Sequence, residues 1–248
     1  MGAIYRRELG SFFNSALGWV FLTVFYLGAG VLLCLFTLVR RTADMAGFFS
    51  WMRLIMVLVL PLLTMPLLSE ERGKKTDQGL LTAPVSLTSI VMGKYLAALT
   101  LYAIGIAIFF LYALILSFFG AVAWSIVLSN VIALFLLGAA FMAITLFFSS
   151  LTENQFIAYI IGLGILLFLY MFDWCSSALQ VWSESLTIDV LSNIFSGLSK
   201  AMSSVSFYTR IYDFAYGLFD VSGVLLYVST AVLFNFFTVR VLESRRWK

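Results

Sequence analysis

The sequence contains no histidine and only two cysteines. Without an imidazole, the chain cannot build a histidine-ligated metal site or a histidine-assisted nucleophile. We therefore expect no metal and no cofactor of its own. Cys34 and Cys175 form no CxxC pair, and both fall near the outer ends of their predicted spans. A disulfide between them is geometrically possible, and two free thiols packed as small apolar groups are the alternative.

Charge is also scarce, since only 11% of the residues are charged and 62% are hydrophobic. A soluble domain carries about 25% charged residues, so this composition indicates an integral membrane protein. One membrane span needs about 20 apolar residues, and 248 residues leave room for six helices and little else. We expect a single all-α domain, residues 1–248. The net charge of +3 is spread along the chain, which gives no reason to expect a nucleic-acid partner.

Stretches without charge predict six transmembrane helices. The longest runs from Tyr95 to Thr152 and would measure about 87 Å as one helix, so it must fold back once. Phe118, Phe119 and Gly120 predict that turn. Asp173 and Trp174 are expected to end the fifth span. The six predicted spans are residues 18–39, 48–68, 91–118, 125–148, 156–172 and 221–239.

Two further segments suit the membrane surface. Residues 2–16 place Tyr5, Leu9 and Phe12 on one helical stripe, with Arg6 and Arg7 elsewhere around the turn. This pattern predicts an amphipathic helix lying at the interface, and an extension of the first span is the alternative. Residues 173–220 mix charged and apolar side chains, which predicts short re-entrant or interfacial helices on the outer side.

Basic residues set the expected orientation, because they concentrate on the cytoplasmic side. Both termini are expected to be cytoplasmic, with residues 69–90 on the same side. The inner side then carries Arg6, Arg7, Arg72, Lys74, Lys75, Lys94, Arg240, Arg245, Arg246 and Lys248. The outer side carries Arg40, Arg41, Arg53, Lys200 and Arg210.

The largest cluster of charge, Glu70 to Lys75, follows the second span directly. Within hydrocarbon each of these charges would cost roughly 2.5–3.5 kcal/mol, so the cluster must lie in water or against another protein. Its GKKT sequence superficially resembles a phosphate-binding loop. Leu68 stands where that motif needs glycine, which predicts no ATP hydrolysis by this chain. Pro61 and Pro66 precede the cluster and predict a bend or hinge in the second span, static or moving.

A short helix is expected after the cluster. Thr76 or Asp77 would cap it, Leu80 and Leu81 would be exposed for a groove on a partner, and Pro84 would end it. Ser86 or Thr88 would cap the next helix. The alternative is a solvated loop that only holds two spans in register.

The segment from residue 67 to residue 96 reads LLSEERGKKTDQGLLTAPVSLTSIVMGKYL. It resembles the signature of permease subunits of type-2 bacterial ABC exporters. The resemblance implies a coupling region that contacts a cytosolic ATPase dimer. Gln78 is a departure, since it is neutral where many relatives carry glutamate, so the resemblance does not extend to any ion pair that this glutamate would make with the ATPase. The implied coupling residues are Glu70, Glu71, Arg72, Gly73, Thr76, Asp77, Gln78, Gly79, Leu80, Leu81 and Pro84.

The two ends of the chain extend this resemblance. The N-terminal helix is similar to the family's elbow helix, with Tyr5, Arg6, Arg7, Leu9, Phe12 and Phe13 as its implied residues. The C-terminal residues 238–247 resemble the GldF-like gliding-motility branch. The family implies a bacterial inner-membrane exporter whose ATPase subunits use ATP and magnesium. A second permease copy, or a GldG-like companion, would complete it.

Two other classes of function compete with export. An intramembrane enzyme needs a nucleophile with its base, or carboxylates with a metal, at membrane depth. No carboxylate lies deep in a predicted span, which argues against it. A non-transporting scaffold that recruits an ATPase is not separated from an exporter by sequence, and nothing in the spans indicates a cargo.

Overall fold

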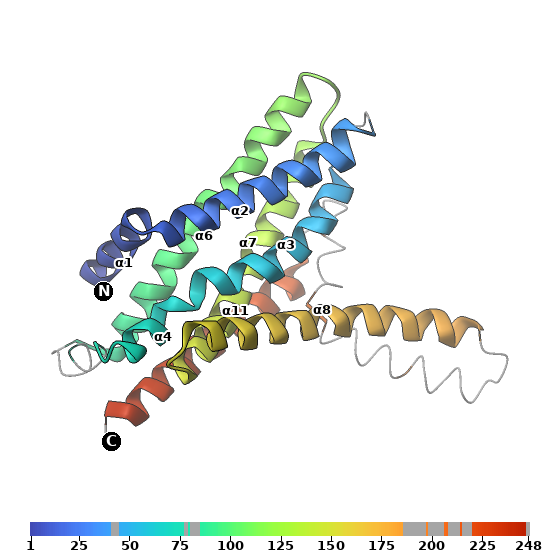
Figure 1. Ribbon diagram of the computed structural model, residues 1–248. Helices are drawn as coiled ribbons and strands as arrows, with labels where there is room; N and C mark the ends of the chain where they lie inside the picture. The colour runs from blue at the N-terminus through green and yellow to red at the C-terminus, as the bar shows by residue number, and fades with distance from the viewer. Residues whose placement is uncertain are drawn as a thin grey trace.

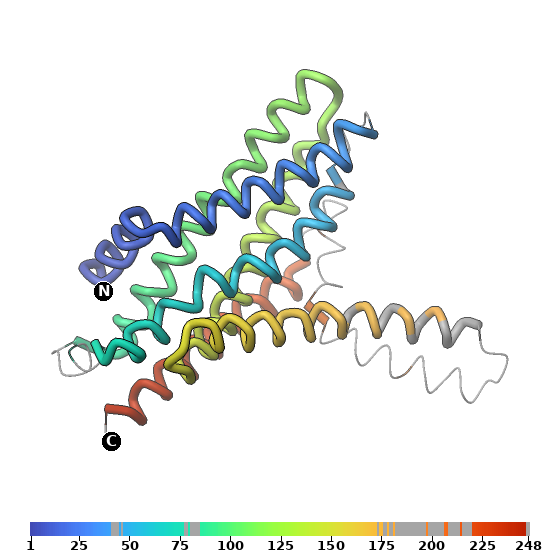
Figure 2. Tube along the Cα trace, in the orientation of Figure 1, coloured from blue at the N-terminus to red at the C-terminus, as the bar shows by residue number. Residues whose placement is uncertain are grey.

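The computed structural model describes residues 1–40, 45–76, 79, 85–185, 197, 206–207, 214 and 220–246, and every element formed by these residues is helical (Figure 1). The tube in Figure 2 follows the same path. A π-helical stretch, η1 (Cys34–Leu38), continues α2. The helices are α1 (Gly2–Asn14), α2 (Ala16–Leu33), α3 (Ala46–Thr64), α4 (Pro66–Gly73), α6 (Leu87–Ser117), α7 (Trp124–Leu151), α8 (Gln155–Ser185) and α11 (Val221–Arg246).

Six of the helical segments are long and apolar enough to cross a membrane, which confirms the all-α, six-span fold class. Some of their ends differ from the sequence prediction. The second segment runs on to Gly73 and the third begins at Leu87. The side chain of Ser86 accepts the amide of Ser89 at 3.3 Å, so Ser86 caps α6 as one of the two predicted candidates. The candidate segments are Ala16–Leu38, Gly47–Gly73, Leu87–Ser117, Trp124–Leu151, Gln155–Phe172 and Val221–Arg246.

Helix α7 forms the centre of the bundle, where it packs against α3, α4, α6, α8 and α11. Every residue from Leu137 to Leu146 is buried. At Gly138 an added Cβ would lie 2.3 Å from the phenolic oxygen of Tyr102. That hydroxyl donates to the carbonyl oxygen of Leu134 at 2.7 Å. Glycine at this position therefore permits the close approach of α6 to α7.

The fifth candidate span ends at Phe172, as predicted, but helix α8 does not stop there and continues to Ser185. The sequence from 173 to 185 contains neither glycine nor proline, so nothing in the backbone stops the helix. In Figure 1 this helix extends away from the bundle. Its side chains Phe156, Ile160 and Phe168 are largely exposed. An apolar face of this kind suits lipid or another membrane protein.

Most of the segment predicted to hold interfacial helices lies outside the described residues. Phe207 and Phe214, which are described, are buried. The ring of Phe207 lies 6.0 Å from that of Phe141 in α7, and the Ser129 hydroxyl donates to the carbonyl of Phe214 at 2.7 Å. These two residues therefore lie against the spanning helices.

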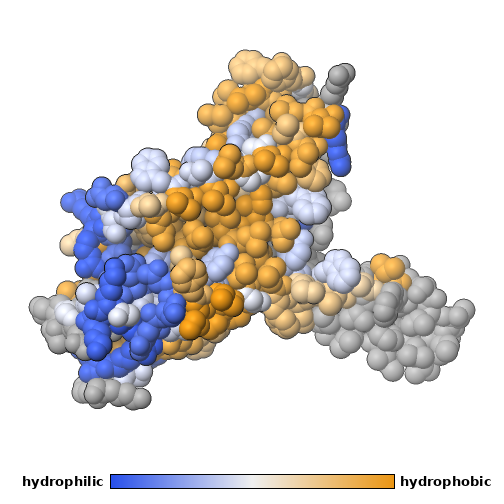
Figure 3. All heavy atoms as spheres, viewed as in Figure 1, coloured by the Kyte–Doolittle hydropathy of each residue, from blue (hydrophilic) through white to orange (hydrophobic). Residues whose placement is uncertain are grey.

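Both ends of the chain lie at one end of the bundle, together with α4 (Figure 1). Hydrophilic residues gather at this end on the face seen in Figure 3, beside a broad apolar area. This shared end carries the candidate site.

Candidate functional site

Helix α4 carries the first charged residues of the site. Pro66 occupies its first turn, where a missing amide costs nothing. Leu67 and Leu68 are buried, whereas Glu70 and Glu71 are partly exposed. Burial of the apolar first turn of α4 therefore fixes the position of the charged turn that follows it.

The end of α4 is a Schellman-type cap. Lys75 has a φ of 56°, the left-handed conformation usually taken by glycine. Its amide donates to the carbonyl of Arg72 at 3.0 Å, and the amide of Thr76 donates to that of Glu71 at 2.9 Å. This cap directs the chain into residues 77–84. Among them, the predicted contacts Asp77, Gln78, Leu80, Leu81 and Pro84 lie outside the described residues, and Gly79 is helical and exposed.

Helix α1 packs its apolar stripe against α6. The hydroxyl of Tyr5 lies 3.0 Å from that of Thr100, and Leu9 and Phe12 join the core. A Cβ at Gly93 would lie 3.0 Å from Ile4, so α6 admits α1 closely at that point. Arg6 and Phe13, two other predicted elbow residues, are exposed. The apolar stripe of α1 thus packs against α6, and the face of α1 that carries Arg7 and Glu8 lies toward α4.

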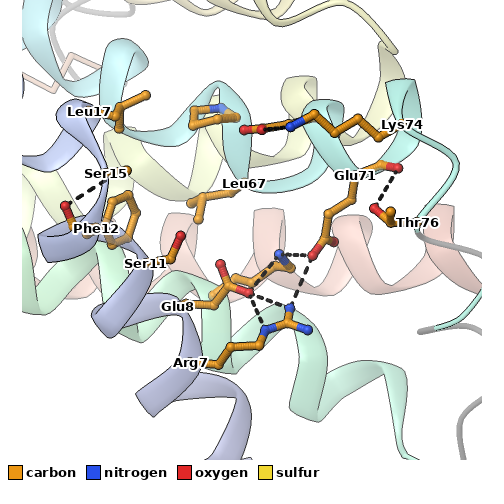
Figure 4. A pocket seen from close by; sticks show the side chains of 13 residues that line it. Arg7, Glu8, Ser11, Phe12, Ser15, Leu17, Leu67, Glu71, Lys74 and Thr76 are labelled. Carbon is orange, nitrogen blue, oxygen red and sulfur yellow. Dashed lines mark hydrogen bonds and ion pairs between the residues drawn. The ribbon is translucent and has the colours of Figure 1, made fainter.

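Arg7, Glu8, Glu71 and Lys94 form a charge cluster between α1, α4 and α6 (Figure 4). The ammonium of Lys94 lies 2.8 Å from the carboxylate of Glu71 and 3.2 Å from that of Glu8. The guanidinium of Arg7 lies 2.5 Å from Glu8 and 3.2 Å from Glu71. Two cations and two carboxylates balance, and each carboxylate contacts both cations.

Burial makes this charge cluster energetically important. The side chain of Lys94 is only 1% exposed, while that of Arg7 is 54% exposed. An isolated buried ammonium is costly, so Lys94 needs both carboxylates. The hydrogen bond to Glu8, together with the charges of Glu8 and Glu71, raises the pKa of Arg7 above its ordinary value. Arg7 therefore stays cationic at every physiological pH.

A second set of contacts ties α4 to the end of α7. The guanidinium of Arg72 donates to the carbonyl of Leu151 at 2.7 Å and pairs with Glu153 at 2.8 Å. Arg245 of α11 donates to the carbonyl of Ser150. Cations at a helix C-terminus satisfy its free carbonyls and its dipole. A Cβ at Gly73 would lie 2.7 Å from the carbonyl oxygen of Glu153, so glycine is needed for this close approach.

The predicted hinge prolines differ in their local structure. Pro61 lies inside α3, which continues through it. The helical pattern is interrupted only at Met65, before Pro66, and Met65 itself keeps helical angles, φ −54° and ψ −43°. The hydroxyl of Ser149 in α7 donates to the carbonyl of Met65 at 2.7 Å. The bend at Met65 is therefore slight, and the carbonyl of Met65 is held by Ser149 of α7.

Sequence reasoning missed Glu8 and counted Lys94 only among the basic residues of the inner side. One signal was available for Lys94, because a helix capped at Ser86 carries this lysine two turns inside and thus needs a partner there. Among the described residues there is no group of three His, Cys, Asp or Glu side chains placed to hold a metal ion. The charges of the site pair across α1, α4 and α6.

Comparison with known protein families matches residues 40–234 to the family described as ABC-2 family transporter protein. No curated protein matches the chain significantly. The match covers most of the sequence, including α3, α4, α6 and α7. The chain therefore belongs to the ABC-2 transporter family and is a multi-pass permease subunit of an ABC transporter.

Proposed function

We propose that this permease couples ATP hydrolysis by a separate cytosolic ATPase dimer to export across the bacterial inner membrane. Residues 69–90, between the end of α4 and the start of α6, are the proposed ATPase contact, and both termini face the cytoplasm. ATP and magnesium are bound by the ATPase, and this chain supplies the moving helices. The family membership implies an ATPase partner in general terms.

The contact between Lys94 and Glu71 is the observation that carries this proposal. It joins α4 to α6, the two helices that flank residues 74–86 (the hairpin), and Glu8 adds α1 to the same charge cluster. Arg72 links α4 to the end of α7. A partner that displaces the hairpin would therefore move several spanning helices together, provided that it binds two packings of the bundle with different affinity.

Pro61 and Pro66 are the proposed hinge. Each lacks a backbone donor, so the α3–α4 segment bends there at lower cost than elsewhere. Ser149 of α7 is the contact that would resist or release this bend.

The GldF-like branch is a finer proposal, which rests on the likeness of the C-terminal residues. A second permease copy or a GldG-like companion is the corresponding partner. The exposed apolar side of α8, with Phe156 and Ile160, supports the presence of a membrane-embedded neighbour or lipid along that helix.

Exchange of two leucines for aspartate tests the ATPase contact. Leu80→Asp with Leu81→Asp should abolish co-purification of the cognate ATPase, because apolar anchors are lost from the hairpin. The exchange avoids Glu71, since that residue holds the buried Lys94. Phe119→Asp is the matched control, because Phe119 is 82% exposed in the turn at the opposite end. Undiminished ATPase recovery with the leucine variant would refute the assigned contact.

A scaffold would bind the ATPase without changing its turnover. The reconstituted complex therefore separates the two functions, because a coupled permease alters the rate of ATP hydrolysis when its own helices are restrained. An unchanged rate in a complex with cross-linked spans would favour the scaffold.

A further inference from the structure

A pocket of about 410 Å³ lies between α1 and α4 at the end of the bundle that carries the charge cluster (Figure 4). Arg7, Glu8 and Ser11 of α1 line one side, and Glu70 and Lys74 of α4 line the other. A volume of this size suits a small ligand or the polar part of a larger one.

The lining of the pocket changes from apolar to charged. Figure 4 shows Phe12 and Leu17 on one side of the pocket and Glu71, Lys74 and Thr76 on the other. A ligand that matches both sides must be amphiphilic, with a polar group and an apolar continuation.

The apolar side of the pocket lies beside the first turn of α2, where the first candidate span begins. Leu17 belongs to the first turn of α2, and Trp19 follows it with its side chain 57% exposed. The indole nitrogen of Trp19 donates to the carbonyl of Phe13 at 2.9 Å. Exposed tryptophan is typical of the membrane–water interface. The pocket therefore opens at the depth of lipid headgroups.

The charged side retains free hydrogen-bonding capacity. Arg7 contacts Glu8 and Glu71 through Nε and Nη2, and its Nη1 makes no hydrogen bond with the described residues. Lys74 is 68% exposed and gives one hydrogen bond, to Glu70, which is itself 39% exposed. A phosphate fits the two cations, and an ammonium fits Glu70.

The balance of charge selects among headgroups. The pocket is lined by three cations, Arg7, Lys74 and Lys94, and by three carboxylates, Glu8, Glu70 and Glu71. These charges sum to zero, so a zwitterionic headgroup matches both signs, whereas a headgroup with a single negative charge leaves a net charge in the pocket.

We propose that this pocket binds one ethanolamine-type glycerophospholipid from the adjacent leaflet. Its phosphate lies against Arg7 and Lys74, its ammonium against Glu70, and its acyl chains leave past Phe12 and Leu17 into the bilayer. Glu70, Lys74 and Thr76 of its lining belong to residues 69–90, so the site adjoins the proposed ATPase contact, and it makes the packing of α1 on α4 sensitive to lipid composition.

Native mass spectrometry of the full-length purified protein tests this proposal. The protein is exposed to phosphatidylethanolamine, phosphatidylglycerol or phosphatidylcholine with identical acyl chains. One phosphatidylethanolamine should be retained per chain, about tenfold more strongly than phosphatidylglycerol. Ser11→Trp fills the pocket and should abolish this retention. Asn14→Trp places the same side chain on an exposed position of α1 outside the pocket and should preserve it.

Three results would overturn the site. They are equal retention by the Ser11 and Asn14 variants, retention of phosphatidylglycerol as strong as that of phosphatidylethanolamine, and displacement of the lipid by millimolar inorganic phosphate. The last result would indicate a simple anion site. If the Ser11 variant does not fold, Lys74→Gln replaces it, with about tenfold weaker retention expected and unchanged retention refuting the site. No ATPase enters these measurements, so failure here leaves the proposed function untouched.

Discussion

The ammonium of Lys94 lies 2.8 Å from the carboxylate of Glu71, and this contact closes the hairpin between α4 and α6 at its base. Lys94 is buried within α6, whereas Glu71 sits on the last turns of α4. Glu8 of α1 approaches the same ammonium at 3.2 Å. The ammonium of Lys94 thus joins α6 to both α4 and α1.

Replacement of Lys94 tests the energetic weight of this charge cluster. Lys94→Met leaves two carboxylates facing each other beside Arg7 alone. We expect a loss of about 3 kcal/mol in the free energy of unfolding, near the low end for breaking a buried ion pair, because Arg7 still compensates in part. Reversible unfolding in mixed micelles measures it.

Arg240→Gln provides the control for this experiment. Arg240 pairs with Glu243 at 2.7 Å on an exposed face of α11, and such pairs contribute about 0.5 kcal/mol or less. Equal effects of the Lys94 and Arg240 variants would contradict the burial argument.

Gly73→Ala tests the contact of α4 with the α7–α8 connection. The added Cβ would meet the backbone oxygen of Glu153 at 2.7 Å, and backbone cannot move aside cheaply. We expect a loss of about 1–3 kcal/mol of stability, measured in the same way. Gly10→Ala in α1 meets nothing within 4 Å and should be neutral or stabilising. If both variants behaved alike, the close approach at Gly73 would be disproved.

Gly138→Ala tests the centre of the bundle. Its Cβ would lie 2.3 Å from the phenolic oxygen of the buried Tyr102, forcing the ring away from α7. We expect a loss of about 2–3 kcal/mol, seen as a lower unfolding midpoint. Gly164→Ala in α8, with no atom within 4 Å, is the matched control and should cause no loss. A tolerated Gly138 variant would argue against the close packing of α6 on α7.

Ser149→Ala tests the clamp on the α3–α4 bend. The hydroxyl donates to the Met65 carbonyl, which the Ser69 hydroxyl also bonds, and it accepts the Ser69 amide at 3.3 Å. Its loss therefore deprives the buried Ser69 amide of this partner, at a cost of about 1–3 kcal/mol. Hydrogen exchange should accelerate selectively at the amides from 65 to 69. Ser117→Ala, at the exposed end of α6, should change no exchange rate at that bend. Uniform acceleration along α3 would contradict a local clamp.

The six spans were predictable because charge-free stretches of about 20 residues have few alternatives in a membrane protein. The exact ends of the helices were harder to predict, because a helix continues through polar residues until a cap, a glycine or a proline ends it. Asp173 did not stop α8, and the cap at Ser86 starts α6 before residue 91, the predicted start of that span.

The charge cluster could be predicted only in part. The charge of residues 70–75 marks one end of the bundle, and the basic face of α1 marks a surface helix. The pairing of Glu8 with Lys94 joins residues distant in sequence, and it depends on how α1 packs on α6. A single sequence does not reveal such a contact, because periodicity predicts which face of a helix is apolar but not which helix packs against that face.

Cross-linking from the hairpin to the ATPase tests the central claim most directly. In a chain with Cys34→Ser and Cys175→Ser, which removes two exposed free thiols, a single Lys75→Cys exchange places a thiol at the exposed cap of α4. The account predicts a short-range disulfide or maleimide adduct with the cognate ATPase, and none from Phe119→Cys at the opposite turn. Adduct formation from Phe119→Cys but not from Lys75→Cys would contradict it.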